Sequence, residues 1–127
     1  MNKLSDIIFL GGGGHSLSCC DVLNQNKNFN LIGFIDANKK ALLSESGYEW
    51  LGSDNNMQEA IQKYKNIFIS IGHMKTADKR VFLYEKSKKI GGVFPILKSN
   101  FSYISPTAFI EDGSLIMHGA VINAKAH

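Results

Sequence analysis

Short apolar runs alternate with amphipathic stretches along the first hundred residues. Residues 7–10 form an apolar run that stops at a glycine, and the segments "NLIGFID" and "NIFISIG" repeat this pattern further along the chain. Apolar runs of this length, bounded by turn residues, are typical of strands buried on both faces of a sheet. We assign a last apolar run, "VFPIL", to an edge strand because Pro95 cannot donate a ladder hydrogen bond.

Helical patterns lie between these runs. Ser16 is a candidate N-cap for a helix that carries Leu17, Cys20 and Leu23 at helical spacing. The stretch "SDNNMQEAIQKY" begins with capping residues, and "TADKRVFLYEKSKKIGG" ends in two glycines, which is typical of a helix end. Strands that alternate with helices predict a parallel sheet with right-handed crossovers, an α/β domain of Rossmann-like type.

The pattern changes from Ile104 onwards. The chain divides there into four six-residue units, each with isoleucine first (Ile104, Ile110, Ile116, Ile122) and a small residue fifth (Ala108, Ser114, Ala120, Ala126). This repeat is typical of a left-handed β-helix, in which the isoleucine points inward and the small residue fits a corner. We therefore expect a Rossmann-like domain over residues 1–100 and the first repeats of a β-helix over residues 101–127.

So few repeats cannot form a stable β-helix alone. One coil takes three hexapeptides, and stacked repeats bury their apolar faces only against neighbours. We therefore expect the chain to be the N-terminal fragment of a longer protein, with its β-helix truncated. The alternative is that these units pack back on the sheet domain or on another subunit.

Composition narrows the class of protein. The 127 residues are 44% hydrophobic and 20% charged, as in soluble globular domains, and no apolar run is long enough for a membrane span. No signal peptide is visible, so we expect a cytoplasmic protein without a membrane partner. The net charge of +3 is modest, and the lysine-rich helix is interrupted by Asp78 and Glu85. We interpret it as a solvated face, not as a nucleic-acid site.

The only two cysteines, Cys19 and Cys20, are adjacent in a predicted helix. Neighbouring side chains on a helix diverge too far for a comfortable disulfide, so we expect two buried, reduced thiols. A metal site is not expected because His15 is the only nearby residue that could complete one.

Three loops that follow predicted strands carry candidate binding residues. They are Gly11 to Ser16, Asp36, and Gly72 with His73. Ligands of open parallel sheets bind beyond the carboxyl ends of the strands, and glycine N–H groups at a helix start can approach a diphosphate. The dinucleotide fingerprint G-x-G-x-x-G is not met, because its last position falls on Ser16. A tight turn without any ligand is the alternative.

Histidine and aspartate add candidates at the same place. His15 could donate to a phosphate or a sugar hydroxyl, and Asp36 lies near the spacing at which a carboxylate meets a ribose hydroxyl or a base. A helix-start histidine and a turn aspartate are the respective alternatives. His73 and His118 are further candidates for acid-base work, but we interpret His118 as a surface residue because the third place of a hexapeptide commonly faces outward. No Ser-His-Asp or paired-carboxylate arrangement is readable, so the catalytic residues stay unknown.

The order of these motifs resembles one family. "GGGGHS", "GFID", "SIG" and then "ISPTA" leading into hexapeptides are similar to bacterial acyltransferases that acetylate nucleotide-activated amino sugars or sialic acids. Examples are the UDP-amino-sugar N-acetyltransferase of bacillosamine synthesis and sialic acid O-acetyltransferases. The resemblance covers essentially the whole chain. One departure is "ILKS", with Leu97, where the family commonly has a histidine.

The resemblance implies a division of roles. The N-terminal half would hold a UDP-sugar, and the β-helix of the longer protein would form a homotrimer and bind acetyl-CoA as co-substrate. The implied substrate-binding residues are Gly11, Gly12, Gly13, Gly14, His15 and Ser16 near the phosphates and sugar, Asp36 at the uridine, and Gly72 and His73 as a wall. The family's general base is a histidine beside an acidic residue further along the β-helix. The fragment itself would therefore bind no acetyl-CoA and would be inactive.

Two other classes of protein stay open. A dinucleotide-binding NAD(P) oxidoreductase or redox-sensing domain would use the same loop, although the missing third glycine and the hexapeptide tail argue against it. A non-catalytic module whose tail mediates assembly is the other alternative.

Overall fold

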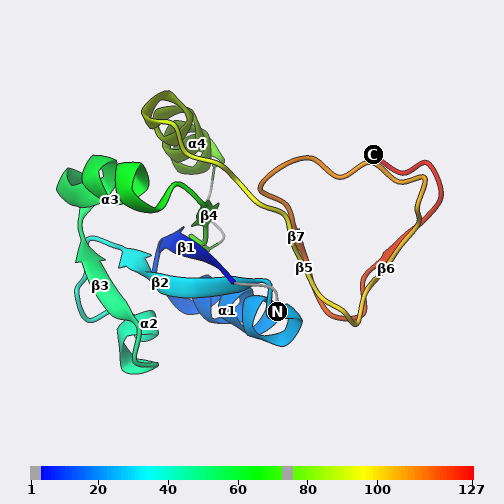
Figure 1. Cartoon of the computed structure of the whole chain (residues 1–127), viewed down its shortest axis with the longest axis horizontal. Coiled ribbons are helices and arrows are strands. Elements are labelled where there is room, and N and C mark those ends of the chain that lie inside the picture. The colour runs from blue at the N-terminus through cyan, green and yellow to red at the C-terminus, as the bar shows by residue number, and fades with distance from the viewer. Residues whose placement is uncertain (1–3, 73–75) are drawn as a thin grey trace.

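The centre of the molecule is a four-stranded parallel sheet. The computed structural model describes residues 4–72 and 76–127, so the predicted site residue His73 lies outside the described residues. The strands are β1 (Ser5–Leu10), β2 (Phe29–Ile35), β3 (Glu49–Gly52) and β4 (Ile67–Ile69), in the order β3-β2-β1-β4 (Figure 1). This confirms the Rossmann-like α/β prediction. The strand order reverses between β1 and β4, which is where such sheets bind ligands.

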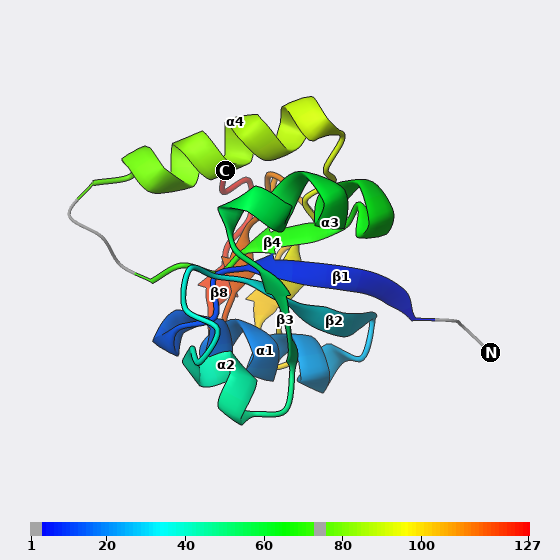
Figure 2. The same cartoon turned by 90° about the vertical axis from the view of Figure 1, so that its left-hand side faces the viewer.

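Helices cover both faces of the sheet. Figure 2 shows α1 (Gly14–Asn26) and α2 (Leu42–Glu45) on one face and α3 (Met57–Tyr64) and α4 (Asp78–Ile90) on the other. A short 3₁₀ turn, η1 (Asp54–Asn56), leads into α3. The sequence did not predict α2 or β3, because both are too short to show a periodicity.

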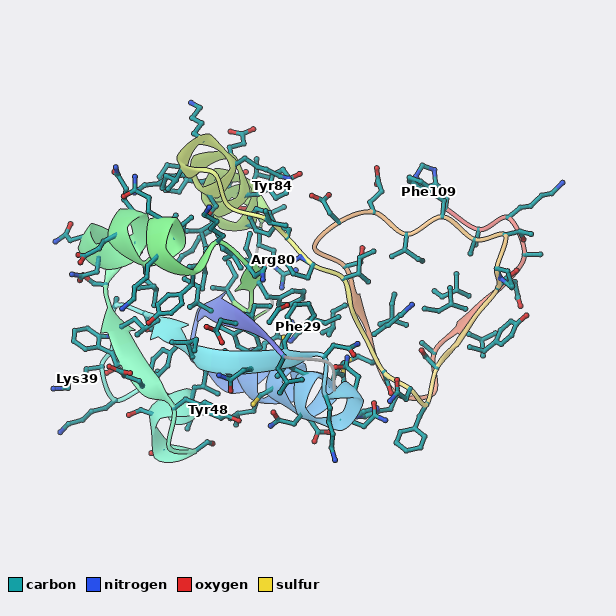
Figure 3. The ribbon with its side chains drawn as sticks, viewed as in Figure 1. Phe29, Lys39, Tyr48, Arg80, Tyr84 and Phe109 are labelled. Carbon is teal, nitrogen blue, oxygen red and sulfur yellow. The ribbon has the colours of Figure 1, made fainter. Side chains whose placement is uncertain are left out.

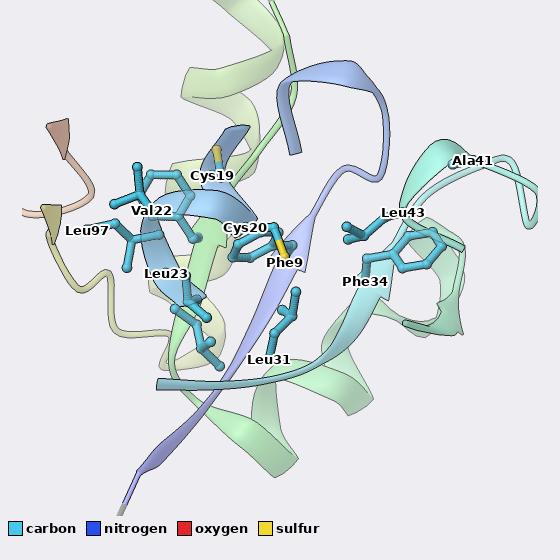
Figure 4. Packing of buried hydrophobic residues seen from close by; sticks show 12 residues of the cluster. Phe9, Cys19, Cys20, Val22, Leu23, Leu31, Phe34, Ala41, Leu43 and Leu97 are labelled. Carbon is cyan, nitrogen blue, oxygen red and sulfur yellow. The ribbon is translucent and has the colours of Figure 1, made fainter. Parts of the chain in front are cut away.

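Strand β1 is buried on both faces, as its unbroken apolar run predicts. Ile7 and Phe9 belong to the cluster beneath α1 and α2 (Figure 4), whereas Ile8 and Leu10 belong to the cluster beneath α3 and α4. All four side chains are buried. Because β1 stands between β2 and β4, its end lies inside the carboxyl edge of the sheet and not at its border.

The ends of the helices follow local chemistry. Helix α4 ends at Gly91, whose φ of 104° is the left-handed conformation that glycine favours. A capping box between Ser53 and Asn56 precedes α3, as "SDNN" predicts. The predicted N-cap of α1 is wrong: the cap is Gly13, and Ser16 lies buried in the first turn.

The expected edge strand at residues 93–97 is also wrong. Val93 makes only one isolated parallel bridge, to Asn66 beside β4. Pro95 lacks a backbone N–H, so the ladder cannot continue. The chain then leaves the sheet, and the Leu97 side chain packs into the cluster beneath α1.

The C-terminal residues form a triangular coil (Figure 1). On one side β5 (Leu97–Lys98) pairs with β7 (Leu115–Ile116), and on another β6 (Tyr103–Ile104) pairs with β8 (Val121–Ile122). The Phe109 N–H donates to the Ala126 carbonyl at 2.8 Å on the third side. Each paired residue lies three hexapeptides from its partner, as the repeat predicts. The domain boundary after residue 100 stays a prediction, and β5 places the first paired residues of the coil shortly before it.

The first residues of the coil make polar contacts with the helices of the sheet domain. The Asn26 side chain donates to the Lys98 carbonyl at 3.0 Å, and the Asn100 N–H donates to Gln25 Oε1 at 2.8 Å. On the α4 side, Lys88 Nζ lies 3.0 Å from an Asp112 carboxylate oxygen. Among the described residues, no helix has the length and apolar character needed to cross a membrane.

Candidate functional site

The loop after β1 contains two different pairs of glycines. Gly11 has a φ of 116°, and a Cβ there would lie 2.8 Å from Ile71 Cγ2; a Cβ on Gly12 would lie 2.6 Å from the Phe34 ring. Both N–H groups are already used: Gly11 donates to the Ile35 carbonyl at 2.8 Å and Gly12 to Asp36 Oδ2 at 2.9 Å. The first pair is therefore required by packing and by backbone geometry.

Gly13 and Gly14 are exposed, and a Cβ on either would meet no atom within 4 Å. They stand at the N-terminus of α1, whose first N–H groups have no partner within the helix. Within the described part of the chain, no hydrogen-bond acceptor is recorded for the N–H groups of Gly13, Gly14 or His15. Three N–H groups beside the positive end of a helix dipole are suited to bind a phosphate.

Asp36 connects the loops that follow β1 and β2. Its Oδ2 accepts from Gly12 and its Oδ1 accepts from the Asn38 N–H at 2.8 Å. Trp50 Nε1 donates to the Asp36 carbonyl at 2.9 Å. Each carboxylate oxygen already has one donor but keeps a second lone pair. The aspartate thus holds the glycine loop in place and can still accept from a ligand.

A crevice of about 90 Å³ opens at the carboxyl ends of the strands, lined by Leu10, Gly11, Ile35, Asp36, Ala37, Asp54, Met57, Ile71, Lys79 and Leu83. Sequence reasoning missed Asp54 and Lys79. Asp54 follows β3, which has no sequence signal, and Lys79 belongs to the helix that we interpreted as a solvated face. The rule that ligands lie beyond strand ends could have pointed to Lys79, because α4 is the helix that follows β4.

His15 faces a second cleft, of about 480 Å³, between the sheet domain and the coil. The cleft is lined by His15, Phe68, Ile69, Arg80, Gly113, Ser114, Leu115 and Ile116. Figure 3 shows Arg80 between α4 and the sheet, where its Nη2 donates to the Ile71 carbonyl at 2.7 Å. Burial, and then the Arg80 charge, lower the pKa of His15. The imidazole is therefore neutral at pH 7 and can donate or accept.

Of the other predicted site residues, Gly72 stands at the site and Ser16 lies beneath it. A Cβ on Gly72 would lie 3.6 Å from His15 Cβ, so Gly72 does stand beside the histidine. Ser16 is fully buried, and its hydroxyl donates to the Gly13 carbonyl at 2.5 Å. Ser16 therefore supports the loop from inside. The role of each predicted residue in binding a ligand stays a prediction.

The two cysteines lie in the hydrophobic cluster beneath α1, and both are free and buried (Figure 4). Burial is the main cause that raises the pKa of the Cys19 thiol to about 12, so Cys19 is not a nucleophile at neutral pH. Over residues 4–72 and 76–127, no three His, Cys, Asp or Glu side chains come together as metal ligands.

Residues 6–82 match the protein family described as the PglD N-terminal domain. The chain is similar to PerB from Caulobacter crescentus, solved in complex with CoA and GDP-perosamine, with 22% identity and a TM-score of 0.81 over 96% of this chain and 56% of that one. It is also similar to the acetyltransferase domain of PglB from Neisseria gonorrhoeae, solved with acetyl coenzyme A, with 21% identity, a TM-score of 0.80 and coverage of 96% and 57%.

The comparison with curated proteins returns no match. At 21–22% identity the solved structures show a shared fold. The chain spans little more than half the length of these structures.

Proposed function

The chain belongs to the PglD N-terminal domain family, and on this premise we propose that it is the nucleotide-sugar-binding part of an acetyl-CoA-dependent sugar acetyltransferase. The observation that carries the proposal is the start of α1. There, Gly13 and Gly14 leave the backbone uncovered, and N–H groups point out of a helix N-terminus. A diphosphate is the group that this arrangement binds best.

The two openings beside this loop accommodate the rest of such a ligand. The crevice with Asp36, Asp54 and Lys79 offers acceptors and a cation for a nucleoside, and the cleft with His15 leads from the loop toward the coil. A nucleotide sugar would thus lie with its base over the strand ends and its sugar toward the coil. The solved relative with GDP-perosamine supports a nucleotide sugar. Uracil, which the resemblance implies, and guanine are separate outcomes of the test below.

Acetyl transfer needs a general base, which the resemblance assigns to a histidine further along the β-helix. In the proposed reaction a sugar amine or hydroxyl attacks the thioester carbonyl of acetyl-CoA, the new N–C or O–C bond forms, and the C–S bond breaks. A base takes the proton from the attacking group, and the CoA sulfur leaves as the thiol after protonation. The residues described here bind and orient the sugar. We assign the base and the acetyl-CoA groove to a longer protein of which this chain is the N-terminal part.

The outer face of the coil supports the proposal that the longer protein forms a homotrimer. Several of its large apolar side chains are more than half exposed: Phe101, Tyr103, Phe109 and Val121. Exposed apolar patches of this kind mark contacts between proteins. Light scattering on the full-length protein should give the mass of three protomers, and a monomer mass would contradict the assembly. A cytoplasmic location is part of the same proposal, supported by the two free cysteines.

Calorimetric titration tests the binding function directly. The chain is titrated in parallel with UDP-glucose, GDP-mannose, NAD and acetyl-CoA. We expect binding of one of the two nucleotide sugars and none of acetyl-CoA. Binding of NAD alone would instead support a dinucleotide-binding oxidoreductase or redox-sensing domain. No binding in any of the four titrations would support a non-catalytic assembly module.

A pair of charge variants assigns the binding to the helix start. Gly14→Asp places a carboxylate among the free N–H groups, where it should abolish diphosphate binding by repulsion and by occupying the donors. Ser18→Asp adds the same charge to an exposed position one turn later in α1. We expect Ser18→Asp to lower the affinity by less than about threefold. Equal losses in both variants would place the ligand elsewhere.

A further inference from the structure

Three side chains meet where the coil touches α1. His118 Nδ1 lies 2.5 Å from Ser99 Oγ, and His118 Nε2 lies 3.2 Å from Asp21 Oδ2. Ser99 and His118 belong to the coil, whereas Asp21 lies on α1, 97 residues before His118. This group is not predictable from the sequence, because His118 shows only the spacing of an outward-facing repeat position.

The donors and acceptors of this group assign its hydrogens. A carboxylate only accepts, so the Asp21 contact requires the hydrogen on His118 Nε2. The Phe101 N–H donates to Ser99 Oγ at 2.9 Å, and the Ser99 hydroxyl is then able to donate to His118 Nδ1. The tautomer with its hydrogen on Nε2 therefore gives both ring nitrogens of His118 a hydrogen-bond partner.

The group has the composition of a hydrolytic triad but cannot act as one. Ser99 is only 3% exposed, so a substrate carbonyl cannot reach its hydroxyl. The Phe101 ring, 5.9 Å from the imidazole, stands edge-on beside it. What the three residues do is join two parts of the chain.

We propose that His118 is a positioning residue that holds the coil against α1 and so fixes the coil relative to the glycine loop at the start of the same helix. Helix α1 is continuous from Gly14 to Asn26, and its last turn makes two further polar contacts with the coil. A rigid helix fixed at one end sets the position of the other. The consequence for acetyl transfer rests on the proposed function, but the contact itself needs no ligand.

Residual dipolar couplings of backbone amides test the contact, because they report the relative orientation of two parts of a molecule. In the unmodified chain, one alignment tensor should fit the amides of the sheet and of the coil. In His118→Ala the coil amides should depart from that tensor and show weaker alignment. His127→Ala is the matched control: this histidine makes an edge-to-face contact with Phe109 within the coil, and its only ion-pair partner among the described residues is Glu111, also in the coil.

Two smaller changes and one spectrum separate positioning from general loss of structure. His118→Asn keeps an amide near the Nδ1 position, and His118→Gln keeps one near the Nε2 position, so each should restore part of the common alignment. The ¹⁵N shifts of the imidazole should show a hydrogen on Nε2 and none on Nδ1 at pH 7.5. A hydrogen on Nδ1 alone, or a common tensor in His118→Ala, would overturn the proposal.

The same variants keep this proposal distinct from the proposed function. If UDP-glucose and GDP-mannose fail to bind while His118→Ala releases the coil, the positioning role stands and the binding function fails. If a nucleotide sugar binds and His118→Ala leaves the alignment unchanged, the reverse holds.

Discussion

The two halves of the glycine run use the same residue for opposite reasons. Gly11 and Gly12 are glycines because the protein itself occupies the space where a side chain would be. Gly13 and Gly14 border open space, so nothing in the described structure requires them to lack a side chain. The first two glycines are therefore required by the structure of the loop, whereas the last two leave space for a ligand. Four consecutive glycines in a sequence do not reveal this difference.

The largest effect is expected from Gly12→Ala. Its Cβ would lie 2.6 Å from the Phe34 ring and 3.2 Å from the Ala41 Cβ, and both neighbours are buried. Overpacking of this kind lowers the free energy of unfolding by about 1–3 kcal/mol. Gly13→Ala meets no neighbouring atom, and only the lower preference of alanine for the N-cap position should reduce the stability, by less than about 1 kcal/mol. Urea denaturation measures the free energy of unfolding of both variants. Equal losses in the two variants would contradict the difference between the two pairs of glycines.

A second effect concerns Asp36, which we group with the structural pair. Asp36→Asn keeps one acceptor but faces an N–H donor with an NH₂ group, so it loses one of the two backbone contacts to Gly12 and Asn38. We expect the free energy of unfolding to fall by about 1–2 kcal/mol. Asp54→Asn, in the same crevice, is the control for charge alone. Asp54 has no comparable contacts to the backbone of the glycine loop, so we expect Asp54→Asn to leave the free energy of unfolding nearly unchanged, and equal losses in both variants would contradict the structural role of Asp36.

The third prediction concerns ligand binding by Gly13 and Gly14. Gly13→Ala places a methyl group where the backbone is proposed to meet the diphosphate, and we expect the affinity for the bound nucleotide sugar to fall about tenfold. The measurement is calorimetric titration at a temperature where the variant is folded. An unchanged affinity would mean that Gly13 does not contact the ligand. The difference between the two pairs of glycines would then have no consequence for binding.

The sequence predicted those parts of the fold that carry an unbroken apolar run, a pair of terminal glycines or a repeat. The buried strand β1, the helix α4 with its terminal glycines and the hexapeptide coil are of this kind. It missed β3, and with β3 it missed Asp54 in the crevice, because four residues carry no usable period. It also placed residues 93–97 in the sheet, because an apolar run does not reveal that the chain leaves the sheet after one bridge and that Leu97 then packs beneath α1.

The sequence indicated where the candidate site lies but not what each of its residues does. Strand ends followed by glycine, aspartate and glycine located the crevice. Which glycines have their N–H groups occupied, and that Ser16 faces inward, depend on Phe34, Ile35 and Ile71, which lie far away in the sequence. The contact between Asp21 and His118 was out of reach for the same reason.

The smallest expected effect is the pH dependence that His15 gives to ligand binding at Gly13 and Gly14. Because burial and Arg80 lower its pKa, the folded protein binds less proton than the unfolded chain near pH 6.5. The stability that comes from the neutral imidazole is therefore present above pH 6.5 and is lost as the pH falls from there toward the lowered pKa. A diphosphate beside the ring would favour the charged form, so ligand affinity should change in the opposite direction and rise as the pH falls.

We expect the affinity for a nucleotide sugar to rise about two- to fivefold from pH 7.5 to pH 5.5, the range of an exposed ion pair. A nucleotide sugar is the right probe, because its diphosphate carries no group that titrates in this range. His15→Gln should remove the dependence, and His127→Gln should keep it. A dependence that survives His15→Gln would show that the histidine stands at the mouth of the loop without meeting the ligand, and the open half of the glycine run would then bind its phosphate through the backbone alone.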